Sequence, residues 1–332
     1  MKAIIPVAGA GTKLRPHTYT QPKALIPLAG STILSIIMDQ LQAAGITEFI
    51  FIVGYLGDKI QDYVQERYPG LTSHFIQQSE RQGIGHAIYL TKDIVGDDEV
   101  FIVLGDSICE YNVKDILDKP HSALGVKRVD DPREFGVAEI NDQGMISRVV
   151  EKPHIPKSNI ALVGIYRIKE TTTLFECLEE NIRNNMMSHG EYNLTDAIEC
   201  MIRKGATIQP FKVQNWFDCG KKETLLQTNA TLLKKHKPVF TDDNPFANTI
   251  IIEPVSIGAG CDIKNSIIGP NVAIGDKVTI NYSIVKDSII GAFADLNDIV
   301  LTQSLIGNDT ELKGESRSLN IGDNTEIDLG KT

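Results

Sequence analysis

Short apolar runs alternate with segments of helical periodicity along roughly the first 235 residues. The pattern predicts strands at residues 3–7, 48–53, 73–77 and 100–104, and helices at residues 58–67, 85–94 and 225–237. A further helix is expected after Ser31 or Thr32, either of which can cap it, with Gly45 as its stop. Strands that alternate with helices form βαβ units, so we expect an α/β fold with a mostly parallel sheet. Ligands of such sheets bind beyond the carboxyl ends of the strands, which directs attention to the loops after Val7 and Leu104.

The pattern changes from about residue 250 onward, where branched apolar residues recur every five or six positions. Three such steps add up to 16 or 17 residues, and several of the apolar residues are followed by glycine. This spacing predicts a parallel β-helix of about four coils, with one side chain of each short strand pointing inward and glycine at tight corners. An ordinary antiparallel sheet is disfavoured by so many inward positions at near-fixed spacing. The positions are Ile257, Ile263, Ile268, Ile274, Ile280, Val285, Ile290, Leu296, Leu301, Ile306 and Leu312.

Three segments follow from these patterns: a domain at residues 1–235, a linker at 236–249 and a β-helix at 250–330. The 332 residues carry a net charge of −10 and no Lys/Arg cluster, which argues against non-specific binding of nucleic acid. The five cysteines form no C-x-x-C pair, so neither a disulfide framework nor a zinc site is indicated. No apolar run approaches the length of a membrane span, and we expect a cytoplasmic protein without a membrane partner.

A glycine turn, G-A-G-T-K-L-R-P at residues 9–16, follows the first predicted strand. Backbone N–H groups of such a turn can bind phosphate. The sequence lacks the G-x-x-x-x-G-K-[ST] pattern of a P-loop, and Leu14 stands where a dinucleotide fingerprint needs glycine. Lys13, Arg15 and Lys23 follow closely, and three cations beside a glycine turn favour a polyphosphate ligand.

With the P-K dipeptide at Lys23, this stretch resembles the signature of the sugar-1-phosphate nucleotidylyltransferases, G-x-G-T-R-L-x-P followed by P-K. The resemblance implies a Rossmann-like nucleotidyltransferase core followed, in many members, by a left-handed β-helix. It also implies that a nucleoside triphosphate and a sugar 1-phosphate react to give a nucleotide sugar and pyrophosphate. The sugar-phosphate oxygen attacks the α-phosphorus in line, with Mg²⁺ as cofactor.

The family's site residues are carried over where this sequence matches the family motifs. Asp106 in V-L-G-D-S and Asp218 in W-F-D-C-G correspond to the Mg²⁺ ligands, and Lys23 to a phosphate ligand. The V-V-E-K-P segment, preceded by F-G-V, matches a sugar site in which lysine holds the sugar phosphate. The resemblance thus implies catalytic Lys13, Arg15, Lys23, Asp106 and Lys152, nucleotide-binding Ala8, Gly9, Gly11, Thr12, Gln78 and Gly83, and sugar-binding Gly136, Glu151, Lys152 and Gly164.

The segment Q-S-E-R-Q-G-I-G-H-A begins at Gln78. In relatives that use pyrimidine nucleotides, a glutamine at this distance from the glycine hydrogen-bonds the base, and an amide can pair with uracil or thymine. Gly83 would let the backbone approach the base, and we expect a structural role for His86. Glu191 also occupies a family position, whereas helix capping accounts equally well for Thr195 and Asp196.

Lys13 departs from the family, which has arginine there, and lysine lacks the planar guanidinium fork; Arg15 lies two residues away and could compensate. UTP and dTTP both remain open as substrates, with glucose 1-phosphate as the expected sugar. The alternatives are a mannose-1-phosphate guanylyltransferase and a non-catalytic subunit that binds nucleotide sugars. No histidine lies beyond residue 236 to serve as the general base of an acyltransferase, so we expect the β-helix to form a homo-oligomer contact or an allosteric platform.

Overall fold

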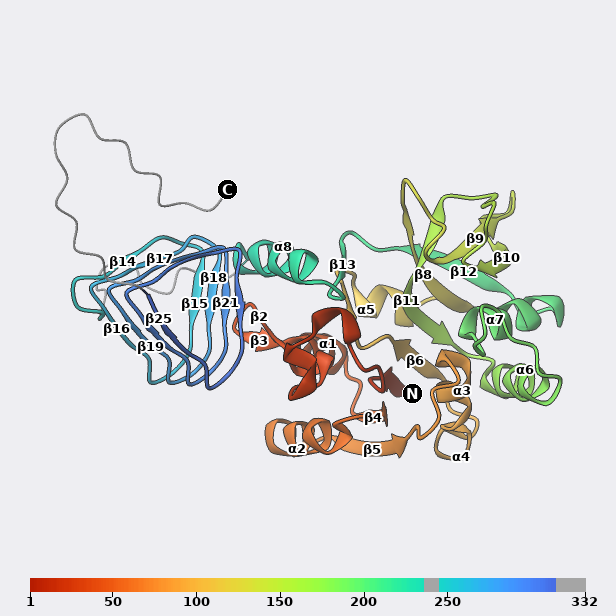
Figure 1. The fold of residues 1–332 in the computed structure, drawn as a ribbon. Helices are drawn as coiled ribbons and strands as arrows, with labels where there is room; N and C mark the ends of the chain where they lie inside the picture. Colours follow the sequence, from red (N-terminus) through yellow and green to blue (C-terminus); the bar gives the residue numbers. More distant parts are fainter. Residues whose placement is uncertain (236–244, 315–332) are drawn as a thin grey trace. The chain divides into compact units, whose positions relative to one another are not determined.

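The computed structural model describes residues 1–235 and 245–314, except for the side chain of Asp218. The chain divides into two compact units, one of residues Met1–Thr228 and one that begins at Asn229 (Figure 1). The predicted linker at 236–249 and the end of the predicted β-helix, residues 315–330, lie partly or wholly outside the described residues.

A nine-stranded mixed sheet forms the centre of the first unit. Four neighbouring strands are parallel, in the order β6 (Val100–Val103), β1 (Lys2–Pro6), β4 (Glu48–Val53) and β5 (Thr72–Gln77). Strand β11 (Ile160–Ile168) runs antiparallel to β6 and continues the sheet to β8 (Ser122–Arg128), β9 (Gly136–Ile140), β10 (Ile146–Glu151) and β12 (Ile208–Lys212). The predicted α/β fold is confirmed, and the second half of the sheet adds antiparallel pairs to its parallel core.

The predicted helices are present, with two differences: residues 85–94 form two helices, and the helix expected at 225–237 ends at Leu233. Helix α1 (Ile33–Ala43) starts at a capping box, in which the Thr32 hydroxyl accepts from the backbone N–H of Ser35, and α2 spans Gly57–Arg67. The helix expected at 85–94 is instead α3 (Ile84–Tyr89) and α4 (Lys92–Val95), and between them the buried Thr91 hydroxyl donates to the carbonyl of Ile88 at 2.7 Å. The remaining helices are α5 (Val113–Leu117), α6 (Thr171–Arg183), α7 (Leu194–Arg203) and α8 (Lys222–Leu233). No helix among the described residues is long and apolar enough to cross a membrane.

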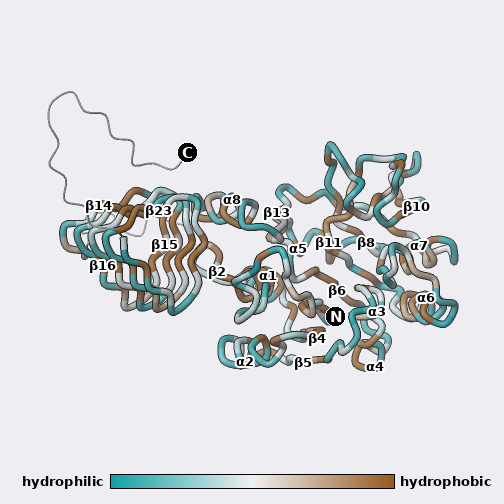
Figure 2. The backbone as a smooth tube through the Cα atoms, viewed as in Figure 1, coloured by the Kyte–Doolittle hydropathy of each residue, from teal (hydrophilic) through white to brown (hydrophobic). Residues whose placement is uncertain are grey.

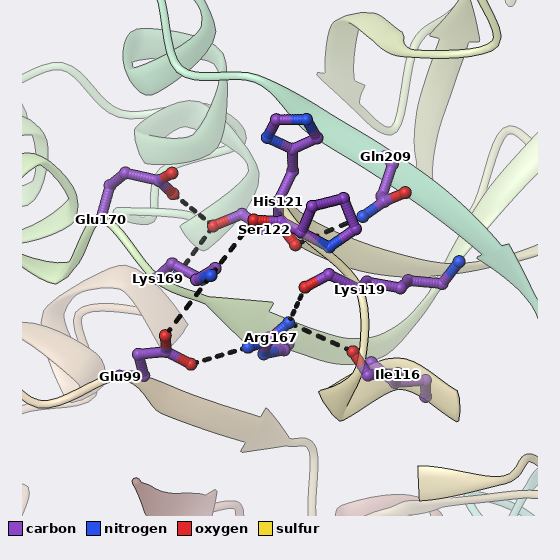
Figure 3. A network of polar contacts seen from close by, with 10 residues as sticks. Glu99, Ile116, Lys119, His121, Ser122, Arg167, Lys169, Glu170 and Gln209 are labelled. Atoms are coloured by element: carbon purple, nitrogen blue, oxygen red, sulfur yellow. Dashed lines mark hydrogen bonds and ion pairs between the residues drawn. The ribbon is translucent and has the colours of Figure 1, made fainter. Parts of the chain in front are cut away.

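A buried arginine of β11 joins the segment before β6 and the end of helix α5 at the edge of the sheet where β6 begins and β11 ends (Figure 3). Arg167 is only 4% exposed, and its guanidinium donates to the Glu99 carboxylate at 2.9 Å. It also donates to the backbone carbonyls of Ile116 at 3.2 Å and Lys119 at 2.6 Å. A buried charge needs such partners, and these contacts lie at the edge opposite the carboxyl ends of the parallel strands.

The second unit is a parallel β-helix, as predicted, whose short strands stack into three four-stranded sheets. Figure 2 shows apolar positions recurring from coil to coil along it. The predicted inward residues from Ile263 to Leu296 are buried, and Ile257, Leu301, Ile306 and Leu312 pack partly buried against them. The sheets contain β14 (Ile250–Ile251), β17 (Ile267–Ile268), β20 (Ile284–Lys286) and β23 (Val300–Thr302); β15 (Val255–Ile257), β18 (Val272–Ile274), β21 (Ile289–Ile290) and β24 (Leu305–Ile306); and β16 (Asp262–Lys264), β19 (Thr279–Asn281), β22 (Asp295–Asn297) and β25 (Glu311–Lys313).

The glycines of the Ile-Gly pairs have two roles. Gly269, with φ of +106°, has the positive φ of a corner glycine, as expected, whereas Gly258, Gly275 and Gly291 allow close packing of neighbouring coils. A Cβ on Gly275 would lie 2.7 Å from the backbone nitrogen of Ala292, so this glycine permits the close approach of the next coil. The left-handed backbone of one set of corners instead falls on Asn265, Tyr282 and Asp298, with φ of 51°, 48° and 53°.

Candidate active site

The glycine turn begins directly after β1, at the carboxyl edge of the parallel strands. Gly11 has φ of +60°, and a Cβ there would lie 2.8 Å from Thr18 Cγ2 and 3.0 Å from Lys23 Cβ, so only glycine fits. The Thr18 hydroxyl donates to the Gly11 carbonyl at 2.8 Å and closes the turn. Ala8 is buried, whereas Gly9 and Thr12 are exposed. The turn therefore requires glycine at position 11 and exposes Gly9 and Thr12 to solvent.

Lys23 and Asp106 meet at the same edge, because β1 and β6 are adjacent and parallel. Lys23 Nζ lies 3.1 Å from Asp106 Oδ2, with the lysine side chain 14% exposed and the aspartate side chain 50% exposed. The pair places a cation and a carboxylate from residues 83 positions apart beside the glycine turn. Such a pair can hold phosphate oxygens and their counter-cation.

The second predicted Mg²⁺ ligand is Asp218. Its strand β13 (Trp216–Asp218) pairs with β7 (Ser107–Cys109), so that its backbone lies opposite Ser107, while its side chain lies outside the described part of the structure. The described residues contain no group of three His, Cys, Asp or Glu side chains suited to a metal ion. Mg²⁺ commonly takes only one or two protein carboxylates together with water and substrate phosphate, so the half-exposed Asp106 carboxylate fits such an ion.

In the described part of the structure, the two cations of the glycine loop, Lys13 and Arg15, do not join the Lys23–Asp106 pair. Lys13 and Arg15 are exposed, and within the described residues neither forms a hydrogen bond or an ion pair with Lys23 or Asp106. The Arg15 guanidinium carbon lies 5.0 Å from the ring centroid of Tyr19, and the Tyr55 hydroxyl donates to the Tyr19 carbonyl at 2.8 Å. The aromatic ring thus holds Arg15 beside the loop, while Lys13 projects into solvent.

Gln78 follows β5 at the same edge of the sheet and is 7% exposed. Its amide nitrogen donates to the carbonyl of Gly83 at 3.1 Å and lies 3.3 Å from Nδ1 of His86. Gly83 has φ of +101°, and a Cβ there would lie 2.5 Å from the carbonyl oxygen of Tyr192. This glycine is therefore required by its packing against Tyr192. Its predicted approach to a base stays a prediction.

The residues predicted to bind sugar gather around Glu151, whose side chain is 13% exposed. The Thr195 hydroxyl donates to Glu151 Oε2 at 2.7 Å, and Lys152 Nζ lies 3.8 Å from Oε1. Gly136 pairs with Glu151 across β9 and β10, and a Cβ on Gly136 would lie 3.1 Å from the Thr195 hydroxyl and 3.3 Å from Glu151 Oε2. Gly164, with φ of +82°, packs against Leu104, two residues before Asp106.

Tyr166 is a site residue that the sequence did not indicate. It is buried, and its hydroxyl has a pKa raised by burial first, and then by the negative charges of Glu151 and Asp106. Since both carboxylates act on one phenol, Tyr166 lies near a predicted sugar residue and near a predicted metal residue. Its place in β11, which sequence alone does not pair with β6, explains why no motif revealed it.

The structure shows that Thr195, in the G-E-Y-N-L-T-D segment, is not a helix cap. Helix α7 begins after Asn193, so Thr195 lies inside the first turn, and its hydroxyl bonds Glu151 rather than capping the helix. Asp196 is beside it, and its pKa is raised by burial, an effect opposed by hydrogen bonds from Ser188 and Asn193 and by His189. Phe135 packs edge-on against Trp216 with ring centroids 4.7 Å apart, which links the sugar residues to strand β13.

The model of one protein family, described as nucleotidyl transferase, matches residues 2–235. The chain belongs to the nucleotidyl transferase family. A glucose-1-phosphate thymidylyltransferase of Streptomyces antibioticus is 30% identical over 360 aligned positions, which cover 99% of each chain. A UTP–glucose-1-phosphate uridylyltransferase of Haloferax volcanii is 32% identical over 231 positions, which cover 67% of this nucleotidyl transferase and 93% of that protein.

Among solved structures, a UDP-glucose pyrophosphorylase complexed with UDP-glucose superposes with a TM-score of 0.63 at 23% identity. The superposition covers 71% of this nucleotidyl transferase and 99% of the other chain. It shows a shared fold.

Proposed function

We propose that this nucleotidyl transferase joins dTTP or UTP to a sugar 1-phosphate, with glucose 1-phosphate as the expected sugar. The observation that carries the proposal is the Lys23–Asp106 pair, 3.1 Å apart, with the glycine turn beside it. Thymidylyl- and uridylyltransferases among the relatives support the substrate pair. The products are a nucleoside-diphosphate sugar and pyrophosphate.

The reaction needs positioning and charge neutralisation rather than a covalent intermediate. The backbone of the glycine turn and Lys23 would bind the triphosphate, and Lys152 would hold the sugar phosphate. An oxygen of that phosphate forms a new bond to the α-phosphorus, and the bond between the α-phosphorus and its bridging oxygen to the β-phosphorus breaks. The electron pair leaves with pyrophosphate, and the anionic phosphate oxygen needs no base to remove a proton.

Mg²⁺ is part of the proposal, with Asp106 and Asp218 as its protein ligands. When bound, the ion would neutralise charge on the phosphate oxygens and screen the approach of two anions. Asp106 would hold the ion, and Lys23, which contacts Asp106 at 3.1 Å in this structure, would bind phosphate. Glu151, which is largely buried and accepts from Thr195, would also accept hydrogen bonds from sugar hydroxyls.

The domain boundaries at 235 and 249, a cytoplasmic location and a homo-oligomer formed through the β-helix stay predictions from the sequence. So do the roles of Lys13 and Arg15. The guanylyltransferase alternative would need a purine base, and the non-catalytic alternative would bind nucleotide sugar without turnover.

One experiment separates these functions. Pyrophosphate release is measured with Mg²⁺ over UTP, dTTP, GTP, CTP and ATP, each combined with glucose, mannose, galactose and N-acetylglucosamine 1-phosphates. A signal confined to UTP or dTTP with glucose 1-phosphate supports the proposal. A signal with GTP and mannose 1-phosphate alone refutes it in favour of the first alternative. No pyrophosphate release with any substrate pair, together with retained binding of a nucleotide sugar, favours the non-catalytic alternative.

A further inference from the structure

The orientation of the Gln78 side chain follows from its two neighbours. Its terminal amide group lies 3.1 Å from the backbone carbonyl oxygen of Gly83. A carbonyl oxygen only accepts hydrogen bonds, so the nitrogen of the amide must face it, and the amide oxygen must face away. The assignment of oxygen and nitrogen in this side chain is therefore determined by the hydrogen bond itself.

The same amide nitrogen lies 3.3 Å from Nδ1 of His86. Because the nitrogen of an amide can only donate, Nδ1 must accept, and the proton of a neutral imidazole is then on Nε2. Burial lowers the pKa of His86, and the nearby Glu80 opposes this effect. The neutral ring that the geometry requires is thus also the form that its buried position favours.

Both hydrogens of the Gln78 amide are engaged in this arrangement. Within the described residues, the Oε1 atom of Gln78 makes no hydrogen bond, and the side chain presents an acceptor alone. We propose that His86 is a positioning residue that locks the Gln78 amide with Oε1 presented to the nucleotide, so that the site selects a base with a ring N–H donor, such as uracil or thymine. Cytosine, whose N3 is an acceptor, would place two lone pairs against each other at that point.

This inference rests on the proposed function, because base selection is measured as turnover. It assigns His86 no contact with substrate. A histidine that merely packs in the helix α3 would affect stability and all triphosphates equally, whereas a positioning residue changes the ratio between bases. The comparison of UTP with CTP is therefore the informative one, since the two differ at N3 and C4 of one ring.

The test uses the full-length chain and three variants: His86→Leu, which removes the acceptor; His86→Asn, whose side-chain oxygen can accept in its place; and Gln78→Ala. The kcat/KM values for UTP and CTP are measured with glucose 1-phosphate and Mg²⁺ at pH 7.5. His86→Leu frees the amide to rotate, and the UTP/CTP ratio falls by about tenfold, the value of one neutral hydrogen bond. His86→Asn restores most of the ratio, and the KM for glucose 1-phosphate stays the same in both.

An unchanged ratio in His86→Leu, with a lowered ratio in Gln78→Ala, overturns the positioning role while the proposed function stands. Wild-type protein that releases no pyrophosphate with any triphosphate refutes the proposed function and the selection with it. If His86→Leu fails to fold, the ring tautomer in the wild-type protein decides. The ¹⁵N chemical shifts of the imidazole should show Nε2 protonated and Nδ1 bare, and a protonated Nδ1 refutes the orientation of Gln78.

Discussion

Replacement of Thr195 by valine tests how the sugar residues are held. Thr195 is 4% exposed, and its hydroxyl donates to Glu151 Oε2 at 2.7 Å. Valine keeps the shape and removes the donor. Glu151 also forms an ion pair with Lys152, in which the two charged atoms are 3.8 Å apart. The lysine side chain is 48% exposed, so solvent screening makes this ion pair weak. The hydroxyl is therefore the main partner of a largely buried carboxylate.

A hydrogen bond to a charged group contributes about 1.5–3 kcal/mol, and its loss leaves a buried carboxylate oxygen without a donor. Since each 1.4 kcal/mol is a factor of ten, kcat/KM for the sugar 1-phosphate should fall by about 10- to 150-fold. The KM for the triphosphate should change less than twofold. The midpoint of thermal unfolding should fall by about 3–12 °C, at 2–4 °C for each kcal/mol in a unit of this size.

The assay is initial-rate pyrophosphate release with each substrate varied in turn, together with a thermal melt. Thr195→Ser is the matched control, because serine retains the hydroxyl and should stay within about threefold of the wild type. A normal kcat/KM for the sugar phosphate in Thr195→Val would refute the role of this hydrogen bond. An equal loss for both substrates would show a general disturbance of helix α7 instead.

Three further predictions concern separate parts of the chain. Asp106→Asn should abolish turnover while leaving the thermal midpoint nearly unchanged, since Asp106 is half exposed, and near-normal rates would remove the metal assignment. Arg167→Met should lower the free energy of unfolding by about 1–3 kcal/mol in urea titrations, because the carbonyls of Ile116 and Lys119 lose their charged donor. Lys169→Met removes a 3.7 Å contact with the Glu99 carboxylate and should lower the free energy of unfolding by less than about 1 kcal/mol. Equal effects of the two substitutions would contradict this ranking. Because burial lowers the pKa of His86, although Glu80 opposes it, the UTP/CTP selectivity should be constant above pH 7 and decline only at pH values below the ordinary histidine range; a decline that begins above pH 7 would contradict it.

The fold was largely predictable because its signals are local. Strand β4 occupies the predicted residues 48–53, and Thr32 caps α1 as expected, since apolar runs and capping residues act within a few positions. The β-helix could be predicted because the spacing of its inward apolar residues repeats in every coil. The division of residues 85–94 into two helices escaped prediction, because the apolar pattern continues across the break at Leu90 and Thr91. The glycines of the Ile-Gly pairs were placed correctly in the repeat, but their close packing against the next coil is a property of the stack.

The candidate site contains two kinds of residue. Some lie in recognisable sequence motifs, and others contact and orient those motif residues. Lys23 and Asp106 could be predicted as partners, because the carboxyl ends of adjacent parallel strands meet at one edge of the sheet. Thr195, Tyr166 and His86 could not, since each acts on its partner through a pairing of elements distant in the chain or through one specific hydrogen-bond geometry.

This separation explains what a motif can specify. A motif names the groups that would touch substrate, because their chemistry restricts the choice of residue. The orientation of such a group depends on neighbours that other residue types could replace. Gln78 illustrates the difference: its sequence position indicates an amide beside the nucleotide, and an amide both donates and accepts. The contacts with Gly83 and His86 decide which of its two faces is left free, and the proposed preference for uracil over cytosine follows from that face.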